Sequence, residues 1–137
     1  MNKLCDSLFK YGLHDTSISN IGIEDFVLSL RFDEGVYLLD SANKETVKTD
    51  KIILKFYIEK FASESVFQHL DCRFFKRRKV VYVTIDEFIN KINRQYNEIN
   101  NVFYSGFNDI VVMNGRFDNC EYEFIVENVE RIEFENA

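Results

Sequence analysis

Short segments in which apolar and polar side chains alternate recur along this chain, and they constrain its fold more than any other feature. The clearest segment runs from Lys51 to Phe61, with Ile52, Leu54, Phe56 and Ile58 forming the apolar set. Because successive side chains of a strand point to opposite faces of a sheet, this alternation predicts a half-buried strand. Weaker strand patterns occur at 26–32, 36–39, 72–75, 80–83, 102–104, 109–113, 120–127 and 129–134.

One segment has a helical period instead. Thr84-Ile85-Asp86-Glu87 is a capping box, in which the threonine hydroxyl accepts a bond from the backbone N–H three residues on. We expect an amphipathic helix over about 85–99, ended by Asn100-Asn101, with one apolar face formed by Ile85, Phe88, Ile89, Ile92, Tyr96 and Ile99. Residues 2–11 have a similar but shorter pattern followed by Gly12, which predicts a short N-terminal helix.

These elements predict an α+β fold in which a mostly antiparallel, curved or barrel-like sheet is covered by the helix at 85–99. A chain of 137 residues with 46% hydrophobic content supplies one core, so we expect a single compact domain over 1–137. Asp33-Glu34-Gly35 predicts a tight turn before a returning strand at 36–39. Asn114-Gly115 is typical of a type I′ hairpin turn.

The N-terminus has no signal-peptide pattern, and no apolar run is long enough to span a membrane, so we expect a cytoplasmic protein without a membrane partner. Cys5, Cys72 and Cys120 are widely spaced and odd in number, which favours buried free thiols over disulfides or zinc ligands. No cofactor-binding motif is present, and we expect neither a cofactor nor a metal.

The formal net charge of −6 is concentrated at one end of the chain. Residues 118–137 contain seven acidic residues and one arginine, so they account for all of it. Such asymmetry can orient a charged partner. The candidate partner-binding residues are Glu121, Glu123, Glu127, Glu133 and Glu135, which pairing of the last two strands would place on a single surface. The alternative is an ordinary solvated face.

A basic cluster lies in the middle of the chain and is expected at the tip of a hairpin. Its members are Arg73, Lys76, Arg77, Arg78 and Lys79. Cations beside Phe74 and Phe75 are a pattern found on surfaces that bind phosphate or nucleic acid, although the two aromatic residues also fit the core end of a strand. The sequence pI of about 5.0 argues against nucleic acid as the main partner.

The two histidines are the candidates for catalysis. His14 is followed by Asp15, and a carboxylate can orient an imidazole for acid–base chemistry. However, neighbours on an extended segment point to opposite faces, so a structural role at a helix-to-strand junction is favoured. His69 and Cys72 are the pair to examine for a cysteine nucleophile. His69, Asp71 and Cys72 lack the second pair of ligands that zinc sites usually have.

One stretch of the chain has a family resemblance. Leu13-His14-Asp15 is followed by Ile18 and Ile21, and then by Leu28, Leu30, Phe32 and Gly35. This arrangement resembles the opening of small bacterial immunity-type proteins, which are encoded beside polymorphic or contact-dependent toxins. The resemblance implies a non-catalytic domain that neutralises a cognate toxin by binding it, and it assigns no catalytic residue.

Three hypotheses therefore follow from the sequence. The first is an immunity protein that binds a basic toxin, for example a nuclease, through its acidic surface. The second is a module that contacts phosphate or nucleic acid through the hairpin at 73–79. The third is a small enzyme that uses His14 or His69. The sequence leaves the oligomeric state undetermined.

Overall fold

The computed structural model describes residues 10–60, 65–105, 109–117 and 119–137. Strands dominate it, and they alternate with one α-helix and one short 3-10 helix in the following order along the chain: β1 (Tyr11–Gly12), β2 (Asn20–Glu24), β3 (Val27–Phe32), β4 (Tyr37–Leu39), β5 (Glu45–Lys48), β6 (Ile52–Ile58), η1 (Val66–His69), β7 (Leu70–Lys76), β8 (Lys79–Tyr82), α2 (Ile85–Arg94), β9 (Glu98–Ser105), β10 (Ile110–Arg116), β11 (Glu121–Val126) and β12 (Val129–Asn136).

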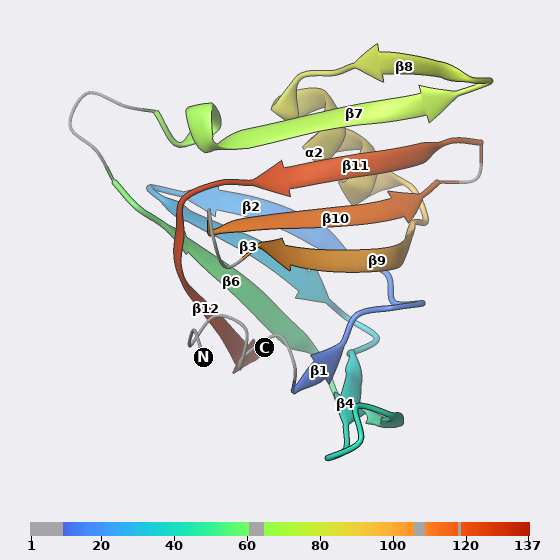
Figure 1. Cartoon of the computed structure of the whole chain (residues 1–137), viewed down its shortest axis with the longest axis vertical. Helices are drawn as coiled ribbons and strands as arrows, with labels where there is room; N and C mark the ends of the chain where they lie inside the picture. Colours follow the sequence, from blue (N-terminus) through green and yellow to red (C-terminus); the bar gives the residue numbers. More distant parts are fainter. Residues whose placement is uncertain (1–9, 61–64, 106–108, 118) are drawn as a thin grey trace.

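The strands form three antiparallel sheets. A five-stranded sheet has the order β8-β7-β11-β10-β9, a four-stranded sheet has the order β12-β6-β3-β2, and a small sheet has the order β1-β4-β5. The prediction of a mostly antiparallel sheet with one main helix is confirmed, but the sheets do not close into a barrel. In Figure 1 the four-stranded sheet and α2 lie behind the five-stranded sheet, against the same side of it.

The core lies between these layers. The buried apolar side chains form one cluster that draws on both large sheets and α2, and that includes Leu28 of β3, Phe56 of β6, Phe88 of α2 and Phe124 of β11. The rings of Phe88 and Phe124 stack with centroids 4.8 Å apart. Each of the two large sheets therefore has an inner face in the core and an outer face away from it.

The capping box is confirmed, because Thr84 Oγ1 accepts a bond of 3.1 Å from the Glu87 N–H at the start of α2. The helix is shorter than predicted, since it ends at Arg94 and Gln95 has extended backbone angles. Tyr96, which was expected on the apolar face of the helix, is 64% exposed. Ile99 is buried, but it belongs to β9 and not to the helix. Asn97 explains the early end, because its side chain bonds to the backbone of Ile18 and needs a chain that has left the helix.

Two asparagines, one near the end of α2 and one just after it, bond to the backbone before and within β2. Asn97 accepts a bond from the Ile18 N–H at 3.0 Å and donates one to its carbonyl at 2.8 Å. Asn93 makes the same pair of bonds to Ile21, at 2.8 and 3.4 Å. The backbone of Asp15 and Thr16 also bonds to Ile99 at the start of β9. The junction at 12–21 thus ties the edge of one sheet to the edge of the other.

The turn at Asp33-Glu34-Gly35 is confirmed, with Gly35 at φ +79°. The strand after it, β4, does not return along β3 but pairs with β1 and β5. The predicted N-terminal helix lies mainly in residues outside the described ranges. Tyr11, near its predicted end, belongs to β1.

The hairpin turn predicted at Asn114-Gly115 is wrong, because both residues lie inside β10. The register of β10 against β9 shifts between them, as in a β-bulge. A Cβ atom at Gly115 would lie 2.3 Å from the ring of Tyr122, which is fully buried on β11. Glycine here permits a close approach of backbone and ring, which is the other common reason for glycine within a strand.

Candidate functional site

The outer face of the five-stranded sheet carries a row of apolar side chains, which we call the apolar row. It consists of Phe103, Val112 and Ile125, and the strand register places Val112 directly between the other two. Phe103 is 56% exposed, and the other two are partly buried. No described helix or strand lies over this face in Figure 1. An exposed sheet face is normally polar, so this row is a departure from the usual pattern.

Next to the apolar row lies a charged pair on β7 and β11. Arg73 Nε donates a bond of 2.8 Å to Glu123 Oε1, and the two residues are directly opposite in the register. This bond raises the pKa of the Arg73 guanidinium, with a further contribution from Tyr82. Arg73, predicted as part of the basic cluster, therefore neutralises Glu123 instead of joining the other cations.

Three acids on or beside the same face have no ion pair with any described residue. Asp71 is opposite Ile125, Glu121 is at the start of β11, and Glu127 directly follows its end. All three are exposed. The face therefore combines an apolar centre with a surrounding negative charge.

Glu133 and Glu135 lie elsewhere, on the outer face of the four-stranded sheet. Glu133 accepts a hydrogen bond of 3.1 Å from the Tyr57 hydroxyl and forms an ion pair with Arg131 Nε at 3.0 Å, and Glu135 pairs with Lys55 at 2.9 Å. The Arg131 guanidinium also lies 3.9 Å from the centre of the Tyr57 ring. We call these five residues the cross-strand charge network, and in it each glutamate is matched by a cation.

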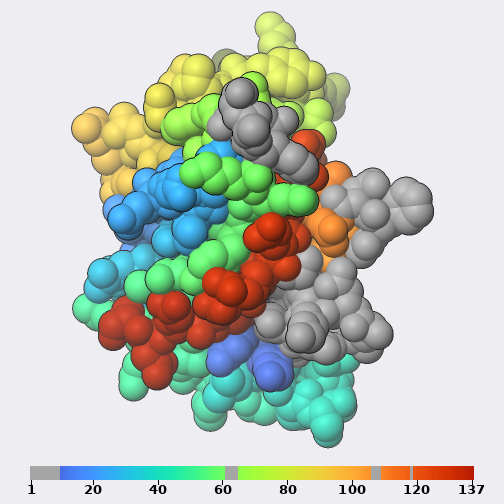
Figure 2. Space-filling model, turned by 90° about the vertical axis from the view of Figure 1, so that its left-hand side faces the viewer, coloured from blue at the N-terminus to red at the C-terminus, as the bar shows by residue number. Residues whose placement is uncertain are grey.

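The prediction that five glutamates share one surface is therefore wrong. β12 pairs with β6 and not with β11, because the chain turns at Asn128, whose φ is +56°, and enters the other sheet. The five-stranded sheet faces the viewer in Figure 1, and the strands of the four-stranded sheet come into view when the molecule is turned by 90° in Figure 2. Of the five glutamates, only Glu121, Glu123 and Glu127 lie on β11 or directly after it, and β11 is the strand that contributes Ile125 to the apolar row.

The basic hairpin is confirmed. β7 and β8 are joined by Arg77 and Arg78, and Lys76 and Lys79 face each other at the ends of the strands. We call these four exposed residues the basic tip. Both arginines have left-handed backbone angles, with φ of 47° and 68°. Turns of this kind normally contain asparagine and glycine, and the left-handed region costs other residues about 1–2 kcal/mol each.

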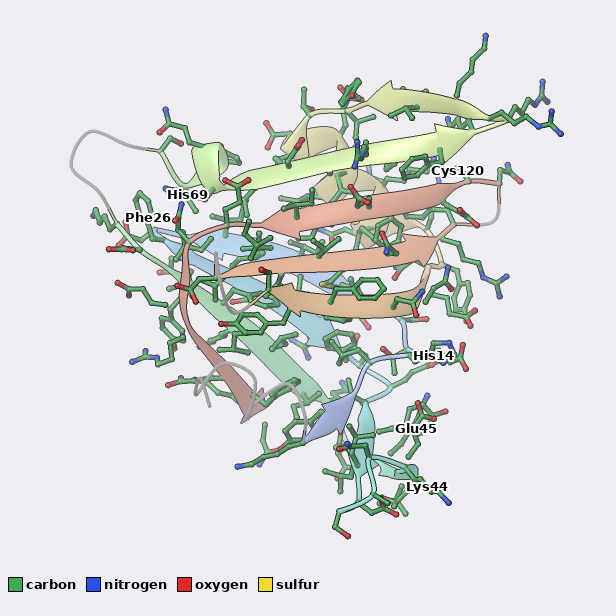
Figure 3. The ribbon with its side chains drawn as sticks, viewed as in Figure 1. His14, Phe26, Lys44, Glu45, His69 and Cys120 are labelled. Carbon is green, nitrogen blue, oxygen red and sulfur yellow. The ribbon has the colours of Figure 1, made fainter. Side chains whose placement is uncertain are left out.

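His14 and Asp15 form a pair at an exposed turn. His14 Nδ1 lies 3.0 Å from Asp15 Oδ2, and both side chains are more than half exposed. The expectation that they point to opposite faces is wrong, because Asp15 has φ +62° and so departs from the extended geometry behind that expectation. Figure 3 shows His14 far from both His69 and Cys120.

His69 is 4% exposed and packs at the end of η1. Its Nδ1 lies 2.8 Å from the side-chain nitrogen of Asn128, and its ring meets Phe26 edge-on at 6.2 Å (Figure 3). The thiol of Cys72 points elsewhere, 3.4 Å from the carbonyl of Val83. Burial raises the pKa of this thiol to about 12, with smaller contributions from Asp71 and Glu87. A thiol held neutral in this way is a poor nucleophile.

The described residues contain no group of three or more potential metal ligands. Cys72 and Cys120 are both buried and free, as predicted, whereas Cys5 lies outside the described ranges. No helix in the described part of the chain is long and apolar enough to cross a membrane.

Sequence reasoning missed a contact between Lys91 and Cys120. The Lys91 ammonium lies 3.8 Å from the Cys120 sulfur and 4.9 Å from the ring centres of Phe74 and Phe117. The apolar row was also missed. Val112 and Ile125 occupy the positions of their strands that alternate with the buried residues. Apolar residues at these positions, in addition to those at the buried positions, were the available signal.

Comparison of the chain with protein-family models, with curated proteins and with solved structures finds no match.

Proposed function

We propose that this chain is a non-catalytic protein-binding domain that neutralises a basic protein toxin in the cytoplasm, and that it binds through the outer face of the five-stranded sheet. The observation that carries the proposal is the apolar row, which is uncovered by any described element and has unpaired acids beside it. The resemblance of the segment 13–35 to immunity-type proteins suggests the class of partner.

The apolar row supplies the contacts that hold a complex together. The centres of protein interfaces are enriched in aromatic and apolar side chains and depleted in charge, while the rim is polar. Phe103 is the most exposed member of the row and is therefore the side chain that loses the most water-accessible area on binding. A large, exposed aromatic side chain is a typical hot spot of a protein interface.

The acids beside the row select the partner. Asp71, Glu121 and Glu127 have no cation paired with them in the described part of the chain, so their charge is available to an incoming protein. Complementary charge increases the rate of association and disfavours acidic competitors. Glu133 and Glu135 suit this role less well, because Lys55 and Arg131 already neutralise them.

The test uses the C-terminal domain of the protein encoded immediately upstream as the candidate toxin. Bacteria that express this domain are expected to stop growing, and co-expression of the full chain is expected to restore growth. The variant Phe103→Ser with Glu121→Lys and Glu127→Lys should abolish rescue and weaken binding at least a hundredfold. Its matched control is Glu133→Lys with Glu135→Lys, which alters charge on the other sheet and should still rescue.

Two results would contradict the proposal. One is continued growth arrest when the unaltered chain is co-expressed at a level that exceeds the toxin. The other is equal affinity for the two variants, which would show that the outer face of the five-stranded sheet does not form the contact. Circular dichroism of both variants checks that they remain folded.

A further inference from the structure

The strand β8 forms an open edge of the five-stranded sheet. It stands at one end of the sheet order, and no described strand pairs with its far side. All four of its residues are exposed, including Val80 at 46%, Val81 at 39% and Tyr82 at 73%. In Figure 1 it runs along the top of the molecule, beyond the cover of α2. Apolar residues on an open edge favour pairing with another strand, and most proteins avoid them.

The register shows which backbone groups the edge presents. In a hairpin with a two-residue turn, the residues that flank the turn exchange both hydrogen bonds, and the pattern then alternates. Lys76 and Lys79 flank the turn, so Lys79 and Val81 bond to β7. The N–H and C=O groups of Val80 and Tyr82 therefore point away from the sheet. These are the groups that an added strand would bind.

The basic tip lies at the start of this edge. Its positive charge indicates that a ligand bound there is negatively charged. Its four cations are consecutive in sequence and form no ion pair with a described residue. Two of them hold left-handed backbone angles that asparagine and glycine would adopt more easily. Mutual repulsion and backbone strain both destabilise the hairpin, and a negatively charged ligand would relieve the repulsion.

We propose that β8 binds an extended, acidic segment of a partner protein as a sixth, antiparallel strand of the sheet. This surface is separate from the apolar row, and the proposal does not depend on the toxin-binding function. β8 runs away from the tip, so an antiparallel segment runs toward it. Its backbone would bond to Val80 and Tyr82, and acidic residues at its C-terminal end would meet the four cations.

The test measures fluorescence anisotropy of a labelled ten-residue peptide with the full chain. The peptide has six alternating valine and threonine residues followed by four glutamates at its C-terminus. It should bind at least tenfold more tightly than the same peptide ending in four lysines, and addition of salt should weaken it. It should also bind more tightly than a ten-nucleotide single-stranded RNA, because RNA cannot satisfy the strand edge.

Two variants separate the strand edge from the charge. Val80→Pro removes an N–H that points outward and should reduce peptide affinity at least tenfold, while Val80→Thr keeps the N–H and should not. Arg77→Asn with Arg78→Gly should also reduce affinity at least tenfold, yet it should raise the midpoint of thermal unfolding because the turn becomes unstrained.

The proposal is overturned if Val80→Pro binds the peptide as the unaltered chain does, or if the asparagine-glycine turn leaves affinity unchanged. Tighter binding of the RNA than of the acidic peptide would also overturn it and would assign the tip to phosphate recognition. The thermal midpoints of all variants show whether a loss of affinity comes from unfolding.

Discussion

The two large sheets share one core but differ in what they expose. On the four-stranded sheet, Lys55 and Tyr57 of β6 bond to Glu135 and Glu133 of β12, and Arg131 pairs with Glu133 within β12, so each glutamate of this outer face has a cation as its partner. On the five-stranded sheet, Phe103, Val112 and Ile125 are aligned across three strands, and the acids nearby form no ion pair with a described residue. The number of glutamates in the sequence does not distinguish the two outer faces. The faces differ because the strands that carry these glutamates have different neighbours in the two sheets.

Glycine substitutions should give the largest contrast between the sheets. Gly115→Ala places a Cβ atom 2.3 Å from the buried Tyr122 ring, and we expect it to lower the free energy of unfolding by about 3 kcal/mol. Gly22→Ala on β2 is the matched control, because its Cβ would meet nothing within 4 Å. The control should raise the free energy of unfolding by about 0.5–1 kcal/mol. Urea denaturation measures both, and equal losses would contradict the role given to Gly115.

Substitution of Asn97 and Asn93 tests how strongly the edges of the two large sheets depend on each other. Asn97→Ala leaves the N–H and C=O of buried Ile18 without their partners, so we expect a loss of about 2 kcal/mol. Asn93→Ala removes one good and one long bond to Ile21, and about 1 kcal/mol should be lost. Hydrogen exchange should accelerate at β2 and at the start of β9 together in Asn97→Ala. Faster exchange at only one of these edges would show that they are independent.

A pair of aromatic substitutions compares the outer faces directly. Tyr57→Thr loses the hydroxyl bond to Glu133 and the contact with the Arg131 guanidinium, which should cost about 1 kcal/mol. Phe103→Thr should change stability by less than about 0.5 kcal/mol, because the ring is already largely exposed. It should instead shorten retention on a hydrophobic column. The comparison fails if Phe103→Thr destabilises the protein more than Tyr57→Thr does.

The inner face of the five-stranded sheet should respond to alkaline pH. Burial raises the pKa of Cys72 from 9.0 to about 12, so the folded protein retains a proton that the unfolded chain loses above pH 9. This contribution to stability is fully present below pH 9 and is lost as the pH rises to 12. Cys72→Ala should therefore lose less stability than the unaltered protein over this range, with little pH-dependent difference near pH 7. Parallel pH profiles for the two proteins would contradict this cause.

Local signals in the sequence were reliable where the structure depends on neighbours in the chain. The Thr84 capping box, the Gly35 turn and the hairpin at Arg77-Arg78 each involve a few adjacent residues, and all are confirmed. The end of α2 and the position of Gly115 were mispredicted, because Asn97 contacts Ile18 and Gly115 contacts Tyr122 on other elements. The candidate surface failed for the same reason, since β11 and β12 are adjacent in sequence but belong to different sheets.

The turn at Glu127-Asn128 has a kinetic consequence. β12 follows every other described strand in sequence, yet it pairs with β6, which precedes it by about 70 residues. β11 likewise completes the five-stranded sheet by joining β7 to β10. Pairings between distant segments close large loops and slow folding. During synthesis, therefore, the four-stranded sheet cannot be completed until β12 has left the ribosome, and the five-stranded sheet cannot be completed until β11 has. Until then, β6 and β7 each have one unpaired edge.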